Sequence, residues 1–205
     1  MAKSNQATVL APVSNDGGKI ISFSEPYVVQ AEIVGTSPFL FHRWSVEGVE
    51  EKARASKGSK AKKTDDTESY VYRDSKGNLA IPSEYFRMSI IGAAKFKQDP
   101  RSPRKSAMDI FKAGIIALDE YCSLGVKDWD YLDRRRVVIQ KSAITRSRPA
   151  MQIGWRIKVR LECVLPEYIS DQLLNEVFQS AGRLVGVGDF RPSFGRFQVV
   201  KFVVE

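Results

Sequence analysis

The sequence predicts an α+β protein with a ferredoxin-like, or RRM-like, β-α-β-β-α-β core that carries long basic insertions. Two periodicities support this prediction. Apolar residues alternate with polar ones in four segments, as in half-buried strands, and they recur every three or four residues in two others, as in amphipathic helices. In chain order, the strand, helix, strand, strand, helix and strand segments are 27–34, 83–96, 137–144, 153–164, 170–181 and 197–204.

A single domain is expected over residues 1–205, because 205 residues, of which 43% are hydrophobic, suffice for one sizeable core. Residues 1–24 are mixed and turn-rich, which predicts a loose N-terminal arm. The order of the core segments then requires residues 45–80 and 97–134 to be insertions.

The first strand, 27–34, is expected to end before Pro38, because proline interrupts regular strand pairing. A short hairpin is predicted from 70–73 and 79–81, which flank a turn-forming segment. Ser83 is the predicted N-cap of the first long helix. The apolar face of that helix carries Phe86, Ile90, Ala93 and Ala94.

Residues 95–105 hold five basic residues, one acid and two prolines, which predicts a loop or a second basic finger. A short helix over 106–112 and an apolar strand over 114–118 are expected to follow. The β-rich runs 137–144 and 153–164 are predicted to form a hairpin around 145–152.

The run 153–164 alternates strictly, so one face is expected in the core and the other is basic, with Arg156 and Lys158. Ser170 is the predicted N-cap of the second long helix, 170–181. The core stripe of that helix consists of Leu173, Leu174, Val177, Phe178 and Ala181. The last strand is expected over 197–204.

The charge balance indicates a polyanionic partner. Lysine and arginine number 32 against 24 acids, for a net charge of +8 and a pI near 9.5. No acid lies between 134 and 148, a stretch that includes Arg146 and Arg148. The run 52–63 holds six basic residues and no acid, which fits either a solvated insertion or a flexible basic finger that grips phosphates.

Other functional classes find little support in the composition. Cys122 and Cys163 lie far apart without metal-ligand spacing, so no disulfide framework, metal site or cofactor is expected. No apolar run approaches the roughly 18 residues of a membrane helix, and the N-terminus lacks the apolar region of a secretion signal. A cytoplasmic protein with no membrane partner is therefore expected.

The stretch 182–197 (GRLVGVGDFRPSFGRF) combines four glycines, three arginines and three phenylalanines, a mixture that suits a nucleic-acid strand. The stretch is not a dinucleotide-binding fingerprint of the form GxGxxG. Arg191 occupies the position of the third glycine, and the stretch follows a predicted helix where the fingerprint follows a strand. The sequence also lacks a GxxxxGK[ST] phosphate loop. The alternative is a tight turn whose glycines are purely geometric.

His42, the only histidine, stands with Arg43 and Trp44 directly after the first strand exit. As a general base it could activate a ribose 2′-hydroxyl, but no orienting partner is identifiable in the sequence. A hydrogen-bonding or packing role is the favoured interpretation.

Three segments resemble the RAMP superfamily, ferredoxin-like RNA-binding proteins that include backbone subunits and processing nucleases of CRISPR systems. They are 35–40 (GTSPFL), 79–83 (LAIPS) with the helix that follows, and 182–197. The chain also resembles phage proteins with PFLFHR-like and GVGDFRPSFGRF-like segments. By this resemblance, Gly186, Gly188 and Gly195 would shape the loop. Arg191 and Arg196 would then contact the strand, and Phe190 or Phe194 would stack on bases.

The leading hypothesis is a non-catalytic protein that binds single-stranded nucleic acid, with RNA favoured, as repeated subunits along the strand or beside other subunits of a nucleoprotein complex. One alternative is a metal-independent endoribonuclease that uses His42, and another is a phage or CRISPR-associated protein-interaction subunit. The expected nucleic-acid-binding residues are Gly186, Gly188, Phe190, Arg191, Phe194, Gly195, Arg196, His42, Arg43, Trp44, Arg146, Arg148, Arg156 and Lys158.

Overall fold

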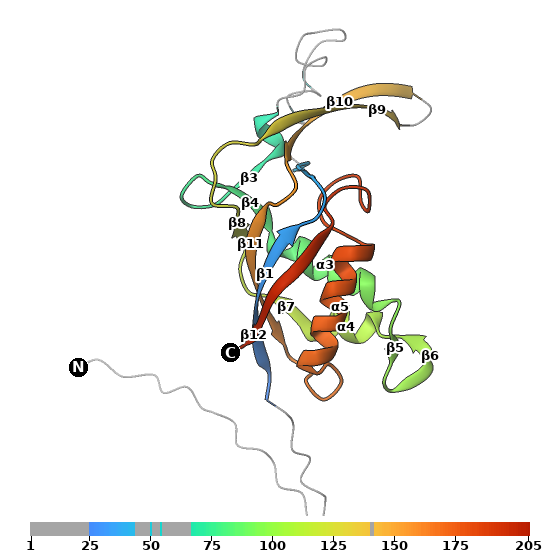
Figure 1. Cartoon of the computed structure of the whole chain (residues 1–205). Helices are drawn as coiled ribbons and strands as arrows, with labels where there is room; N and C mark the ends of the chain where they lie inside the picture. The colour runs from blue at the N-terminus through green and yellow to red at the C-terminus, as the bar shows by residue number, and fades with distance from the viewer. Residues whose placement is uncertain (1–24, 44–49, 51–53, 55–66, 140–141) are drawn as a thin grey trace, which may run out of the picture.

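A computed structural model describes residues 25–43, 50, 54, 67–139 and 142–205, with the backbone alone over 137–139 and 142–144. The predicted N-terminal arm 1–24, the basic run 52–63 (apart from Arg54) and Trp44 lie outside the described residues. The described part of the chain is an α+β fold with antiparallel sheets (Figure 1).

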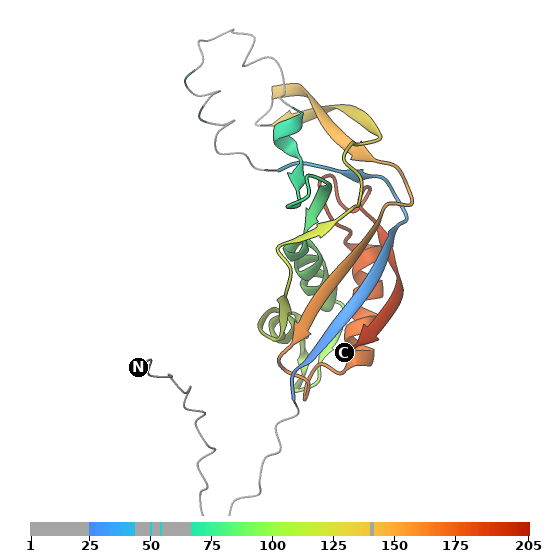
Figure 2. The same cartoon turned by 90° about the vertical axis from the view of Figure 1, so that its left-hand side faces the viewer.

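In this part of the chain, the central sheet has four strands in the order β12-β1-β11-β7, and every neighbouring pair is antiparallel. Its strands are β1 (Tyr27–Gly35), β7 (Ile115–Ala117), β11 (Arg156–Cys163) and β12 (Phe197–Val204). One face of the sheet is covered by the helices α3 (Ser83–Ala94), α4 (Met108–Gly114) and α5 (Asp171–Leu184), as Figure 2 shows from the side.

The core lies between this sheet and its helices. Alternate residues of β1 and β11 point inward and pack against Phe86, Ile90 and Phe178. Burying such side chains supplies most of the favourable free energy of folding, at about 1.5–3 kcal/mol for each large one. The outward residues of β11, Arg156 and Lys158 among them, alternate with these and are exposed, as predicted.

Several predicted elements are confirmed with small shifts of their ends. They are the first strand (β1), the last strand (β12), the two long helices (α3 and α5), the short helix (α4), the apolar strand (β7) and the hairpin of β3 (Tyr72–Arg73) with β4 (Leu79–Pro82). The predicted Ser170 cap is also confirmed, because its Oγ accepts a hydrogen bond from the Leu173 N–H at 3.2 Å.

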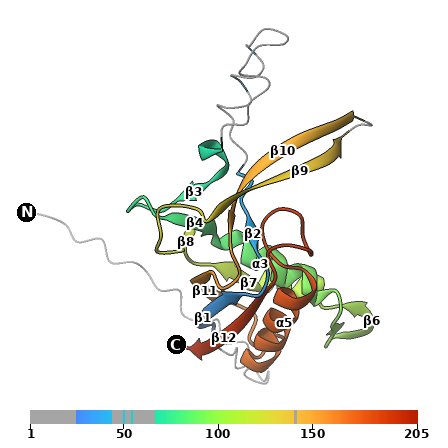
Figure 3. The same ribbon diagram turned by 45° about the horizontal axis from the view of Figure 1, so that its top comes forward.

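The predicted pairing of 137–144 with 153–164 is wrong. β9 (Tyr131–Ile139) pairs instead with β10 (Ser142–Met151), with Ser142 opposite Ile139, so 145–151 are strand residues and not the turn. Figure 3 shows this hairpin projecting from the body of the molecule. β11 pairs with β1 and β7, because its apolar side is needed between those two strands in the core. The place in the central sheet expected for 137–144 is therefore taken by β7.

Two smaller predictions are also corrected. Ser83 is not an N-cap: Pro82 holds the cap position without a side-chain bond, and the Ser83 hydroxyl donates to the Asp119 carbonyl instead. The segment 95–105, expected as a loop or basic finger, forms a small two-stranded sheet of β5 (Gln98–Asp99) and β6 (Ser102–Ser106). Buried Asp99 holds this turn through the guanidinium of Arg101.

The short elements β2 (Phe39–Leu40), β8 (Tyr121–Ser123) and the 3-10 turn η1 (Glu68–Tyr70) carry too little periodicity to be predicted. β2 pairs with the end of β10 and so attaches the projecting hairpin to the strand exit. None of the helices in the described part of the chain is long and apolar enough to cross a membrane.

Candidate nucleic-acid interface

The loop 185–196 lies between α5 and β12, and glycines set its shape. Gly188 and Gly195 both have positive φ, 80° and 70°, which L side chains rarely adopt. A Cβ at Gly188 would lie 2.5 Å from the ring of Phe39, and one at Gly195 would lie 1.6 Å from the Val187 carbonyl oxygen. Gly186, at φ 72°, makes the same kind of close backbone approach. These glycines therefore have a geometric role in the loop, whatever it binds.

The loop is docked on the exit of the first strand. The Gly195 N–H donates to the Pro38 carbonyl at 2.8 Å, and the Asp189 N–H donates to the Leu40 carbonyl at 3.2 Å. The Arg196 N–H donates to the Ser37 hydroxyl at 2.8 Å. Two of the segments that carry the RAMP resemblance are thus in direct contact.

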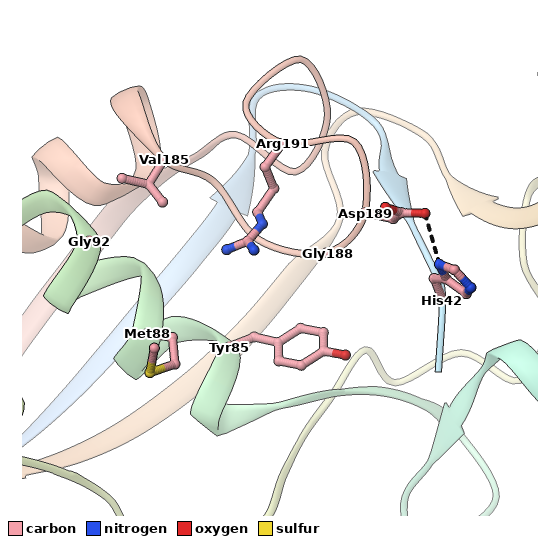
Figure 4. A pocket seen from close by; sticks show the side chains of 8 residues that line it. All are labelled: His42, Tyr85, Met88, Gly92, Val185, Gly188, Asp189 and Arg191. Atoms are coloured by element: carbon pink, nitrogen blue, oxygen red, sulfur yellow. Dashed lines mark hydrogen bonds and ion pairs between the residues drawn. The ribbon is translucent and has the colours of Figure 1, made fainter. Parts of the chain in front are cut away.

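His42 joins this loop to strand β10 of the β9–β10 hairpin. Its Nδ1 lies 3.0 Å from Asp189 Oδ2, and its Nε2 lies 3.0 Å from Arg146 Nη1 (Figure 4 shows the first contact). A guanidinium can only donate, so Nε2 carries the lone pair and Nδ1 donates its proton to the carboxylate. Both ring nitrogens are therefore occupied.

Arg148 forms an ion pair with the same carboxylate oxygen, with its Nε 2.5 Å from Asp189 Oδ2. Burial alone would raise the pKa of Asp189, but the hydrogen bond from His42, the charge of Arg148 and the Phe190 N–H together lower it to about 2. Asp189 is thus ionised at neutral pH, and it fixes the orientation of His42 and Arg148.

Asp189→Asn is expected to reduce the amount by which the free energy of unfolding falls as the pH is lowered. Folding lowers the Asp189 pKa from 3.8 to about 2, so the carboxylate stabilises the native state fully above about pH 4, and this contribution is lost as the pH falls toward 2. Urea unfolding at pH 6, 4 and 3 should therefore show a smaller loss in the variant than in the wild type. Equal losses in both proteins would contradict this role of Asp189.

Next to this network, arginines and phenylalanines are interleaved. The guanidinium of Arg135 lies 4.4 Å from the ring centroid of Phe194, and that of Arg148 lies 5.0 Å from the ring of Phe190. The two rings are 6.4 Å apart, and Phe190 is 38% exposed. Cations held against partly exposed rings are the arrangement that single-strand binding proteins use for phosphates and bases.

A pocket of about 440 Å³ lies between the loop and α3 (Figure 4). Its lining residues are His42, Tyr85, Met88, Gly92, Val185, Gly188, Asp189 and Arg191. The side chain of Arg191 extends from the loop over this pocket, toward Tyr85 and Met88 on the helix. A volume of this size is in the range that holds a nucleotide-sized ligand.

The structure brings most, but not all, of the expected site residues together. The residues gathered around the loop are His42, Arg146, Arg148, Gly186, Gly188, Phe190, Arg191, Phe194, Gly195 and Arg196. Arg43 lies nearby with its guanidinium 5.7 Å from the ring of Tyr72. Arg156 and Lys158 lie elsewhere, on the sheet face opposite the helices.

Two of the expected strand contacts make interactions within the protein. Arg148 is only 4% exposed, so it supports the loop from beneath and does not face solvent. The Nε of Arg196 donates to the Pro192 carbonyl at 2.8 Å within the loop. Arg191 is exposed, as Arg196 is, but no hydrogen bond or ion pair joins its guanidinium to another described residue.

The sequence did not suggest a role for Asp189 or Tyr85, and Arg135 counted only as part of the basic run 134–148 that favours a polyanion. Asp189 had a usable signal, because it is the single acid in the basic stretch 182–197 and therefore a candidate partner for its arginines. Tyr85 had none, since its position in a helix does not show that it borders a loop a hundred residues later. Among the described residues, no group of three or more His, Cys, Asp and Glu side chains could hold a metal ion.

No protein-family model and no curated protein sequence matches the chain. Its fold matches solved structures. A chain in the cryo-EM structure of the Type III-B Cmr-beta bound to cognate target RNA aligns with 88% of this chain, with a TM-score of 0.54 and 11% identity. The present chain spans 61% of that protein's length. At 11% identity this likeness shows a shared fold, which agrees with the RAMP-like fold that the sequence resemblance indicated.

Two further structures align less closely. Cmr6 from Pyrococcus furiosus gives a TM-score of 0.47 at 9% identity, covering 86% of this chain and 99% of its own. A chain of the Csm3-Csm4 subcomplex in the type III-A CRISPR-Cas interference complex gives 0.40 at 11% identity, covering 90% and 82%.

Proposed function

We propose that this chain is a non-catalytic subunit that binds single-stranded RNA in a RAMP-type CRISPR complex. The strand would lie over the loop 185–196 and the base of the β9–β10 hairpin. Support comes from the shared fold with a chain of a complex bound to its target RNA, and from the net charge of +8.

Within this proposal, the central sheet and two helices form a ferredoxin-like unit. The elements β1, α3, β7, β11, α5 and β12 follow one another along the chain, and the order β12-β1-β11-β7 places the first and third strands in the middle. The β9–β10 hairpin is then an insertion between β7 and β11. The loop 185–196 leads into β12 beside the exit of β1. A ligand bound there can contact the loop and the strand exit together.

One observation carries the proposal: partly exposed aromatic rings share a surface with arginines, and not all of these are neutralised by an acid. Arg135 pairs with buried Asp133, whereas Arg191 has no ion pair with another described residue. Asp189 is already engaged by His42 and Arg148. Arg191 is therefore left to meet an external anion, while Phe190 offers a face for stacking. Stacking of bases on aromatic rings contributes about 1–3 kcal/mol each and tolerates any base.

The test of the proposal is a binding panel with labelled 20-nucleotide single-stranded RNA, single-stranded DNA and duplex. Binding of the RNA, with affinity falling steeply as salt rises, is expected from phosphate contacts. Failure to bind any nucleic acid would instead favour the protein-interaction alternative. Repeated copies along the strand would appear as a number of bound chains that rises with RNA length in native mass spectrometry.

His42→Ala is expected to leave RNA affinity within a few-fold, and neither protein is expected to cleave RNA with or without divalent metal. A general base needs a ring nitrogen that can accept the proton of a ribose 2′-hydroxyl, whereas both nitrogens of His42 are engaged by Asp189 and Arg146. The measurement is gel analysis of labelled RNA after incubation. Cleavage by wild type that disappears in His42→Ala would support the endoribonuclease alternative.

A further inference from the structure

A second pocket adjoins the one between the loop and α3. It has a volume of about 660 Å³ and shares Val185, Gly188, Asp189 and Arg191 with the first pocket. The residues that belong to the second pocket alone are Lys95, Phe96, Leu184, Phe190 and Pro192. Arg191 therefore borders both hollows.

Each pocket offers a planar or apolar face to solvent. Tyr85 and Met88 line the first, and Met88 is 50% exposed. Phe96 and Phe190 line the second, at 60% and 38% exposed. The half-buried Tyr85 ring with exposed Met88 lies on one side of Arg191, and two exposed rings lie on the other. This arrangement matches planar bases on both sides of one phosphate.

The polar groups of the two pockets also suit bases and phosphates. Asp189 lines the first pocket beside Tyr85, and its carboxylate can accept a further hydrogen bond from the amino group of a base. In the second pocket, the ammonium group of Lys95 lies 4.8 Å from the ring centroid of Phe96. A second cation there suits the next phosphate of a strand.

We propose that the two pockets hold two consecutive nucleotides of an RNA strand, with Arg191 paired to the phosphate that joins them. This inference rests on the proposed RNA-binding function and adds to it the site and register of one dinucleotide step. The guanidinium of Arg191 presents paired donors that match two phosphate oxygens. The base on one side of that phosphate stacks near Tyr85, and the base on the other side stacks near Phe96 and Phe190.

The test uses the dinucleotide ApA in two forms, with a phosphodiester or a neutral methylphosphonate linkage, as competitors of labelled 20-nucleotide RNA. Wild type should prefer the charged form by roughly five- to tenfold, because one charge-assisted contact is lost with the neutral linkage. Arg191→Gln should abolish this preference, and Arg191→Lys should retain part of it. Arg104→Gln, an exposed arginine on β6, is the matched control and should keep the full preference.

The stacking faces are tested in the same assay. Phe96→Ala and Tyr85→Leu should each weaken competition by ApA several-fold, whereas Tyr85→Phe, which keeps the ring, should behave as wild type. Ile153→Ala, which removes an apolar side chain that is 64% exposed elsewhere, is the control. Thermal melts of all variants confirm that each is folded.

The outcomes separate the two proposals. If the 20-nucleotide RNA does not bind wild type, both the proposed function and this inference fail. If the RNA binds but wild type and Arg191→Gln show the same preference between the two linkages, only the dinucleotide site is overturned. Displacement of RNA by a Phe-Glu-Phe peptide at lower concentration than by ApA would assign the pockets to a peptide and would also overturn it.

Discussion

Gly195→Ala is expected to destabilise the protein by about 2–5 kcal/mol, through backbone strain of about 1–2 kcal/mol and overpacking of about 1–3 kcal/mol. Gly195 has φ 70°, and an added Cβ would lie 1.6 Å from the Val187 carbonyl oxygen and 2.7 Å from its carbon. Both atoms belong to the backbone, so they cannot rotate away. The Gly195 N–H also donates to the Pro38 carbonyl, so a shift of this backbone would weaken one of the bonds between the loop and the strand exit.

The measurement is thermal unfolding, where a change of this size lowers the melting temperature by roughly 4–20 °C in a chain of this length. Gly77→Ala is the matched control. Gly77 has φ 79° in the β3–β4 turn, but no atom lies within 4 Å of its added Cβ, so only the backbone strain applies. Equal losses in the two variants would show that the contact with Val187 contributes nothing.

Phe190→Ala is expected to reduce RNA affinity by about 1–3 kcal/mol while leaving the salt dependence almost unchanged, because stacking releases no counterions. Arg191→Ala should reduce RNA affinity in a different way, through its salt dependence. Loss of one phosphate contact lowers the slope of log affinity against log salt by roughly 0.7 and costs most affinity at low salt. Fluorescence anisotropy of labelled RNA across a salt series distinguishes the two effects.

Two further variants keep this comparison interpretable. Phe197 is 2% exposed and packs against Phe86 and Phe178, so Phe197→Ala should lower the melting temperature first. Arg196→Ala should lower the melting temperature slightly as well as the RNA affinity, since the Arg196 Nε donates to the Pro192 carbonyl. If Phe190→Ala and Arg191→Ala leave RNA binding unchanged and lower only the melting temperature, the loop is a structural turn and the strand binds elsewhere.

Part of the fold could be predicted from local pattern. β1, α5 and β12 each carry a clear periodicity, and Ser170 is a cap because its hydroxyl accepts from an N–H only three residues away. The glycines of 182–197 likewise indicated a backbone that needs positive φ. Such features depend on neighbours within a few residues, so the sequence reports them directly.

Pairing between distant segments was decided only in three dimensions. The turn-like residues in 145–152 suggested a hairpin with 153–164, but β11 completes a better core between β1 and β7, and β10 pairs with β9. Period-two alternation shows which face of a strand is buried, and it does not show which strand lies beside it.

The candidate site, like the fold, was determined in part by the sequence and in part only by the tertiary structure. Sequence by itself determined its chemistry: a net charge of +8 and a loop with arginine, phenylalanine and glycine in which Arg191 and Phe190 stand side by side. Only the tertiary structure placed His42 against Asp189, 147 residues away, buried Arg148 beneath the loop and opened a pocket beside Tyr85. Contacts across such separations depend on how the helices and sheets pack, and no local pattern encodes which side chains that packing will bring within 3 Å.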